Sequence, residues 1–111
     1  MTYKKWDVVF VSKFPNQENK KSYSPKPAIV LAVLVNKLRV CAITSQVHQA
    51  PNYKDTILIK ENSQEIAAMN LDCESLIVLD RIEEIELANI KFSFGTCHSN
   101  TIRTIKGFLS K

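Results

Sequence analysis

The chain has 111 residues, 45% of them hydrophobic, and a net charge of +4 at neutral pH. This length suits one domain with one modest core, so we expect a single domain over residues 1–111. The longest apolar run, 28–35, is too short to cross a bilayer, and we expect no membrane partner. Because no leader-like apolar stretch follows the N-terminal lysines, we expect a cytoplasmic protein.

The charge is divided unevenly along the chain. Residues 1–60 carry ten Lys and Arg against three acidic residues, whereas residues 61–111 carry five against eight. The basic half therefore has a charge of +7 and the other half −3. Such a basic half would attract an acidic partner, of which nucleic acid is the commonest. The alternative is a solvated surface that binds nothing.

In the first half of the chain, apolar and β-branched residues predict strands, and polar stretches predict the loops between them. Two polar loops are expected, over 16–27 with its two prolines and over 46–54. The predicted strands lie over 6–14, 28–35, 38–45 and 55–60.

The second half combines strands with two helices. A short helix is expected over 63–69 with Ser63 as its N-cap, and a terminal helix over 101–109 that begins after His98 or Ser99. Between them we expect a strand over 75–79 that ends at Asp80, then one or two short strands within 81–94. Together these elements predict a mainly β (α+β) domain, a small bent antiparallel sheet or barrel with helices on its rim.

Several enzyme signatures are missing from the sequence. With only two glycines it has no phosphate-binding glycine loop, and it has no metal-ligand motif such as H-E-x-x-H. The three cysteines, Cys41, Cys73 and Cys97, are too far apart to form a zinc motif, and we expect free thiols. We therefore expect no cofactor and no metal.

Polar residues at strand ends and in loops suggest a different chemistry. Lys26 lies between two prolines that restrict its backbone, and Thr44, Ser45, Gln46 and His48 follow one another at the end of a strand. Metal-free RNA cleavage can use such groups. A cation and hydrogen-bond donors stabilise the negative charge that develops on the phosphate. Other groups take the proton from the 2′-OH and give one to the leaving 5′-oxygen. Asp80, which ends a later strand, adds a carboxylate. Taken singly, each of these residues is more often a surface or structural residue.

An ordered set of motifs gives these residues a context. The chain reads Trp-Asp-Val-Val-Phe-Val at 6–11, Pro-Lys-Pro-Ala-Ile-Val-Leu at 25–31 and Val-Cys-Ala-Ile-Thr-Ser-Gln at 40–46. Further on it reads Asn-Leu-Asp-Cys-Glu-Ser-Leu-Ile at 70–77, Leu-Asp-Arg-Ile at 79–82 and Phe-Gly-Thr at 94–96. This order resembles the PemK/MazF family of toxin endoribonucleases. The resemblance covers nearly the whole chain.

The resemblance implies an SH3-like barrel, a homodimer, and a type II toxin that cuts single-stranded mRNA sequence-specifically and without metal. Its cut would leave a 2′,3′-cyclic phosphate, and its partner would be an antitoxin with an acidic tail. The catalytic residues would be Lys26, in place of the family's Arg, Thr44 and Asp80. The residues that we assign to RNA binding are Lys20, Lys21, Ser45, Gln46 and His48.

The chain also departs from the family pattern. Trp6 replaces a glycine, Lys26 replaces the arginine, and Arg81 stands where glutamine is usual. The alternative is therefore a catalytically weak or inactive PemK-like barrel that binds RNA or an acidic antitoxin-like peptide.

Another alternative is an SH3-like barrel that binds a protein partner through aromatic residues. Aromatic side chains near proline-rich loops can form a peptide groove. The aromatic residues in question are Trp6, Phe14, Tyr23 and Tyr53. Ordinary packing in the core and at its rim would account for them as well.

Overall fold

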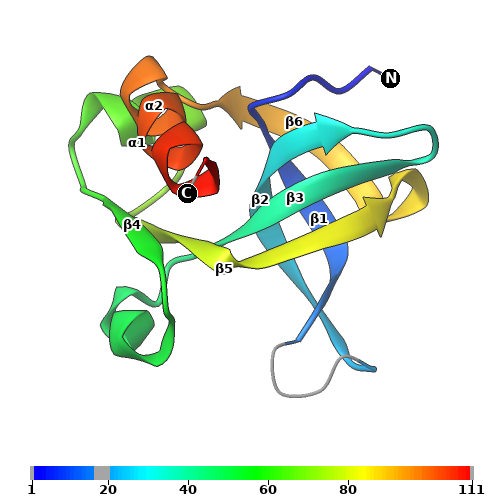
Figure 1. Cartoon of the computed structure of the whole chain (residues 1–111), viewed down its shortest axis with the longest axis horizontal. Coiled ribbons are helices and arrows are strands. Elements are labelled where there is room, and N and C mark those ends of the chain that lie inside the picture. The colour runs from blue at the N-terminus through cyan, green and yellow to red at the C-terminus, as the bar shows by residue number, and fades with distance from the viewer. Residues whose placement is uncertain (1, 17–20, 111) are drawn as a thin grey trace.

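A computed structural model describes residues 2–16 and 21–110 of the chain. This part is mainly β, as predicted, with one six-stranded antiparallel sheet in the order β4-β5-β3-β2-β1-β6 and a few short helices (Figure 1). The strands are β1 Asp7–Pro15, β2 Tyr23–Val33, β3 Lys37–Thr44, β4 Thr56–Ile59, β5 Ser75–Glu86 and β6 Ile90–Thr96. The helices are η1 Val47–Asn52, α1 Gln64–Met69, η2 Leu87–Asn89 and α2 Ser99–Leu109.

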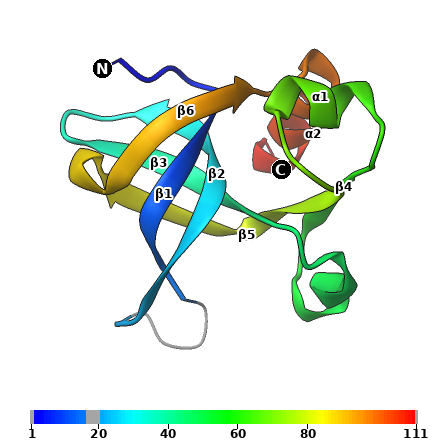
Figure 2. The same cartoon turned by 180° about the vertical axis from the view of Figure 1, so that it is seen from behind.

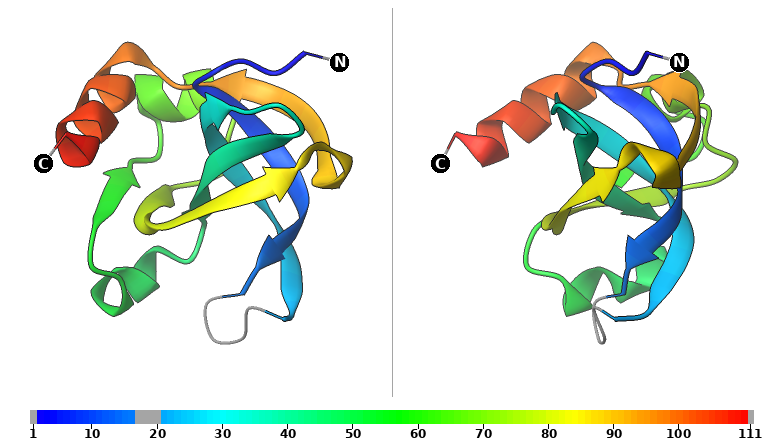
Figure 3. Two further views of the ribbon diagram at one scale, coloured as in Figure 1. Left: turned by 45° about the vertical axis from the view of Figure 1, so that its right-hand side comes forward. Right: turned by 90° about the vertical axis from the view of Figure 1, so that its right-hand side faces the viewer.

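Each face of the bent sheet carries a buried core. Val8 and Val9 point to opposite faces, and both are fully buried, because each face carries its own core. One core lies between the sheet and the helices, where Met69 of α1 and Ile105 of α2 pack. The other core fills the inside of the bend around Phe14. Figures 2 and 3 show α1 and α2 together at one end of the sheet, with the β1–β2 hairpin at the opposite end.

No helix within the described ranges is long and apolar enough to cross a membrane.

The second strand begins earlier than the sequence predicts. We expected a loop up to Pro27, but β2 starts at Tyr23 and includes Pro25 and Pro27. Proline cannot donate a backbone hydrogen bond, so it fits a strand only where one edge has no partner. That condition holds here, because Tyr23–Pro27 pairs with β1 alone, and the β2–β3 ladder begins only at Ala28, opposite Ala42.

The fifth strand is longer than predicted. It was expected to end at Asp80, but it continues to Glu86 through an irregularity. Ala42 pairs with Val78, and its neighbour Cys41 pairs with Ile82, so residues 79–81 have no partner on β3. Such a bulge bends a strand and re-aims its side chains. Asp80 and Arg81 both lie in this bulge.

The predicted helix starts are confirmed. The hydroxyl of Ser63 accepts the backbone N–H of Ile66 at 3.1 Å and caps α1. His98 caps α2, since its Nδ1 accepts the backbone N–H of Asn100 at 3.1 Å. These local contacts explain why short helices form at the predicted places.

Gly95 allows α1 and β6 to approach closely. A Cβ at Gly95 would lie 2.3 Å from the backbone oxygen of Met69, so Gly95→Ala must force the two elements apart. We expect this substitution to lower the free energy of unfolding by about 1–3 kcal/mol in urea titrations. Gly107→Ala is the matched control, because nothing lies within 4 Å of that Cβ; alanine inside α2 should instead add about 0.5–1 kcal/mol. Equal effects of the two substitutions would contradict the proposed close approach.

Candidate functional site

A cleft opens where β2 and β3 separate. On the N-terminal side of Ala28, β2 pairs with β1 alone, and the C-terminal end of β3 pairs with β5 alone. In this region β2 and β3 therefore no longer pair with each other. The space between them is a cleft of about 340 Å³. We call it the β2–β3 cleft, and its polar lining comes from Ser24, Lys26, Thr44, Ser45, Gln46 and Tyr53. The separation of the strands thus brings together four of the predicted site residues.

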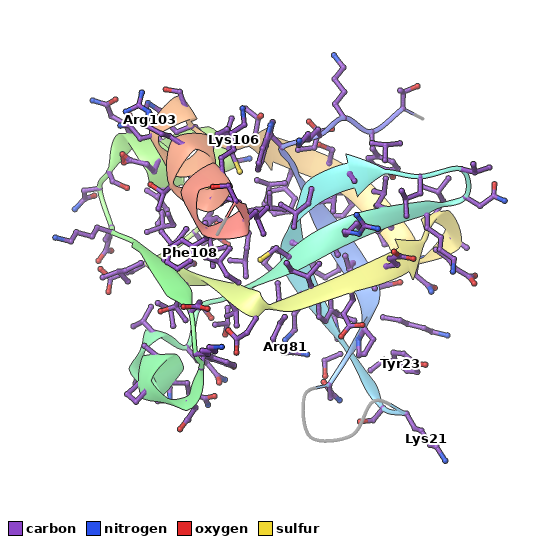
Figure 4. The ribbon with its side chains drawn as sticks, viewed as in Figure 1. Lys21, Tyr23, Arg81, Arg103, Lys106 and Phe108 are labelled. Atoms are coloured by element: carbon purple, nitrogen blue, oxygen red, sulfur yellow. The ribbon has the colours of Figure 1, made fainter. Side chains whose placement is uncertain are left out.

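Two cationic groups meet beside this cleft over one aromatic ring. The Nζ atom of Lys26 lies 5.5 Å from the centroid of the Phe14 ring, and the Cζ atom of Arg81 lies 5.1 Å from it. Both distances fall in the range of cation–π attraction. Arg81 is only 9% exposed and donates a hydrogen bond to the backbone oxygen of Pro15, which fixes its guanidinium between β5 and the end of β1 (Figure 4).

Burial and the neighbouring guanidinium change the acidity of Lys26. Desolvation lowers the pKa of the Lys26 ammonium, and the positive charge of Arg81 lowers it further. Within residues 2–16 and 21–110, no carboxylate forms an ion pair with either cation. The cleft therefore has an excess of positive charge that an anion would neutralise.

Thr44 presents a hydroxyl at the end of β3. Its Oγ1 atom accepts the backbone N–H of Gln46 at 3.2 Å, which leaves the hydroxyl hydrogen free to be donated elsewhere. The side chain is half-buried in the lining of the cleft. Lys26 and Thr44 together can thus offer a positive charge and a hydrogen-bond donor to the same anion.

Asp80 holds a loop instead of lining the cleft. Its two carboxylate oxygens accept the backbone N–H groups of Lys54 and Asp55 at 3.2 and 3.4 Å. These contacts anchor the segment between η1 and β4 to the bulge in β5. The negative charge of Asp80 contributes, after burial, to raising the pKa of the Cys41 thiol to about 12.

The remaining predicted site residues lie apart from the cleft or outside the description. Lys20 is not among the described residues. Lys21 is exposed at the outer end of the β1–β2 hairpin, and Figure 4 shows it pointing away from Arg81. His48 is exposed on η1 and does not line the cleft.

Two residues of the site were not predicted from the sequence. Arg81 was noted only as a departure from a family pattern, and Tyr53 only as one of several aromatic residues. Of the aromatic residues proposed for a peptide groove, Phe14 is fully buried and cannot line one, whereas Tyr23 is exposed and Trp6 and Tyr53 are half-buried. No signal in the sequence identified Arg81, because the strand was expected to end at Asp80, one residue before it.

No protein-family model matches the chain, and no curated protein matches it significantly.

Removing the Lys26 charge should stabilise the fold. A lysine whose pKa is lowered by folding binds its proton less tightly when folded, so it destabilises the protein below that pKa. We expect Lys26→Met to raise the Tm by about 2–4 °C at pH 7. The gain should shrink as the pH rises through the lowered pKa toward the usual value of 10.5, where both states lose the proton.

The control is Lys37→Met, at an exposed lysine that begins β3, which should leave the Tm within about 1 °C. Thermal unfolding followed by circular dichroism measures both variants. A lower Tm for Lys26→Met would mean that Lys26 is a structural residue and not one held at a cost to stability.

Proposed function

We propose that this chain is a PemK/MazF-like endoribonuclease that cuts single-stranded RNA without a metal, as the toxin of a type II toxin–antitoxin pair. The observation that carries the proposal is the β2–β3 cleft of about 340 Å³, which is lined by Lys26, Thr44, Ser45 and Gln46 and has Arg81 near its lysine. The first four of these residues lie in two of the motifs that resemble the family, at 25–31 and 40–46. An RNA phosphate is the anion that fits such a site best.

Lys26, Thr44 and Arg81 each have a different role in the proposed reaction. The 2′-oxygen of one nucleotide attacks the neighbouring phosphorus and loses its proton, while the bond to the 5′-oxygen breaks and that oxygen gains a proton. Negative charge builds on the non-bridging oxygens, where the Lys26 ammonium and the Thr44 hydroxyl stabilise it. Arg81 is a positioning residue, because it is buried and acts by holding the hairpin and by lowering the pKa of Lys26.

Two substitutions relative to the family pattern, Lys26 for arginine and Arg81 for glutamine, compensate for each other and so support the resemblance. The family carries a guanidinium on the second strand, where this chain has Lys26. This chain carries a guanidinium in the β5 bulge, at Arg81, where glutamine is usual. Since both groups lie over the ring of Phe14, a guanidinium remains in the site although it comes from another strand.

Backbone geometry supports the resemblance independently. The motifs place family glycines at positions 6, 70 and 95. Trp6 has a φ of 77° and Asn70 a φ of 57°, which is the left-handed region that glycine adopts most easily. Position 95 is a glycine here, with backbone atoms of Met69 against it. Positions 6 and 70 thus have backbone angles that glycine adopts most easily, and position 95 has no room for a side chain.

The remaining parts of the proposal follow from the family. The bent antiparallel sheet would correspond to the SH3-like barrel, and the active form would be a homodimer. The acidic tail of the antitoxin would compete with RNA for the positively charged cleft. Sedimentation of the purified chain would test the homodimer directly.

The engagement of Asp80 favours one alternative, a barrel that binds RNA or an acidic peptide without cutting. In the family-based assignment Asp80 is catalytic, but here both carboxylate oxygens already accept backbone N–H groups. If cleavage requires that carboxylate, the β2–β3 cleft would retain binding alone.

Cleavage itself is the first test. The purified chain, incubated with a long single-stranded RNA in EDTA, should produce discrete fragments that end in 2′,3′-cyclic phosphate. Thr44→Val keeps the shape of the side chain but removes the donor, and should slow cleavage about 100-fold, the usual effect of losing one transition-state donor. Thr104→Val, at an exposed threonine of α2, is the matched control and should cut normally. Intact RNA with folded wild-type protein would favour the alternative of binding alone.

Binding can be tested separately from cutting. In RNA titrations over a range of salt concentrations, each phosphate contact adds about 0.7 to the slope of log K against log salt. Lys26→Met should therefore reduce the slope by about 0.7, whereas Lys37→Met should not change it. An unchanged slope for Lys26→Met would exclude Lys26 from the phosphate site.

A further inference from the structure

A second cleft joins the β2–β3 cleft. It has a volume of about 290 Å³ and is lined by Phe10 of β1, Phe94 of β6 and the segment that follows α1. Pro27 and Ser45 line both clefts, so the two spaces share a wall. We call the second space the aromatic cleft. Phe10 pairs with Pro27 and Val11 with Lys26, so the side chains of Phe10 and Lys26 leave the β1–β2 ladder on opposite faces, and the two clefts meet at Pro27 and Ser45.

Phe10 and Phe94, which line the cleft, belong to a group of three phenylalanine rings whose third member, Phe92, lies outside the lining. Phe10 and Phe92 are partners in the β1–β6 ladder, and their rings stack with centroids 5.6 Å apart and planes 10° apart. The Phe92 ring meets Phe94 edge-on at 5.9 Å and 62°. Phe92 is 49% exposed although it is large and apolar. Phe10 and Phe94 are half-buried, and aromatic rings that line a cleft are the groups on which proteins stack unpaired bases.

Polar groups lie around the aromatic rings. Asn70 donates from its side-chain nitrogen to the backbone oxygen of Phe94, at 3.0 Å, which fixes the amide and leaves its oxygen as an acceptor. Asp72 is exposed and lines the cleft, and its carboxylate accepts no hydrogen bond from the described residues. Both groups are acceptors, so they suit a base that presents amino or imino hydrogens.

We propose that the aromatic cleft is a subsite for one nucleobase of the RNA whose phosphate lies in the β2–β3 cleft. The inference rests on the proposed function. The base stacks on Phe10 and Phe94, and its edge faces Asn70 and Asp72. Because guanine offers adjacent imino and amino donors on its Watson–Crick edge whereas uracil offers one imino hydrogen, the subsite prefers guanine to uracil.

The chain contains its own reporter for this cleft. Cys73 lines the aromatic cleft and is exposed, whereas Cys41 and Cys97 are buried. Iodoacetamide should therefore alkylate Cys73 first in the folded protein, because only an accessible thiolate reacts. A base in the cleft should slow this alkylation.

The experiment compares guanosine monophosphate, uridine monophosphate and ribose 5-phosphate, with the 3′ and 5′ isomers of each nucleotide, on the full chain. Calorimetry measures affinity, and mass spectrometry measures the rate of Cys73 alkylation. Guanosine monophosphate should bind about tenfold tighter than ribose 5-phosphate, because stacking of one base increases the affinity by about that factor. It should also protect Cys73 from alkylation. Ribose 5-phosphate should bind without protecting it.

Variants separate the two sites. Phe94→Leu should remove the advantage of the nucleotide over ribose 5-phosphate, whereas Lys26→Met should weaken both ligands. Phe108→Leu makes the same exchange on α2, outside the cleft lining, and is the matched control. If Phe94→Leu does not fold, the protection of Cys73 in the wild type still decides the question.

The outcomes distinguish the subsite from the proposed function. Equal affinities for guanosine monophosphate and ribose 5-phosphate, with Cys73 unprotected, would overturn the base subsite but leave the phosphate site. Protection of Cys73 that Lys26→Met does not change would keep the base subsite and overturn the phosphate site. Failure of all three ligands to bind would overturn both.

Discussion

The candidate site depends on a strand that can pair along only one edge. Pro25 and Pro27 lack the N–H groups that a complete ladder requires, so the first part of β2 pairs with β1 and not with β3. Without that pairing, β3 turns toward β5 and leaves the β2–β3 cleft. The same two prolines restrict the backbone of Lys26, so one local feature both opens the cleft and positions its cation.

The site carries features that folding alone would not favour. Lys26 is half-buried near a second cation, with no described carboxylate to neutralise either charge. Desolvated like charges oppose folding, and such arrangements concentrate at functional sites, where a ligand supplies the opposite charge. The ring of Phe14 offsets part of this repulsion, because it attracts both cations.

The bulge in β5 directs two neighbouring side chains to different parts of the structure. Asp80 turns to the loop before β4 and accepts two backbone N–H groups, whereas Arg81 turns inward to Phe14 and Pro15. Loss of the bulge would reverse the direction of these side chains relative to the sheet, since neighbours in a regular strand alternate between its faces. The bulge is thus as important to the site as the residues it carries.

Local patterns in the sequence determined the mainly β class, the antiparallel sheet, the cap at Ser63 and the start of α2 near His98. They also singled out Lys26, Thr44, Ser45 and Gln46, because polar residues at strand ends are visible without knowledge of the partners. Only the tertiary structure placed Arg81 beside Lys26 and turned Asp80 away. The contact of Arg81 with Pro15 spans 66 residues of sequence and depends on a register shift between β3 and β5, which no local periodicity encodes.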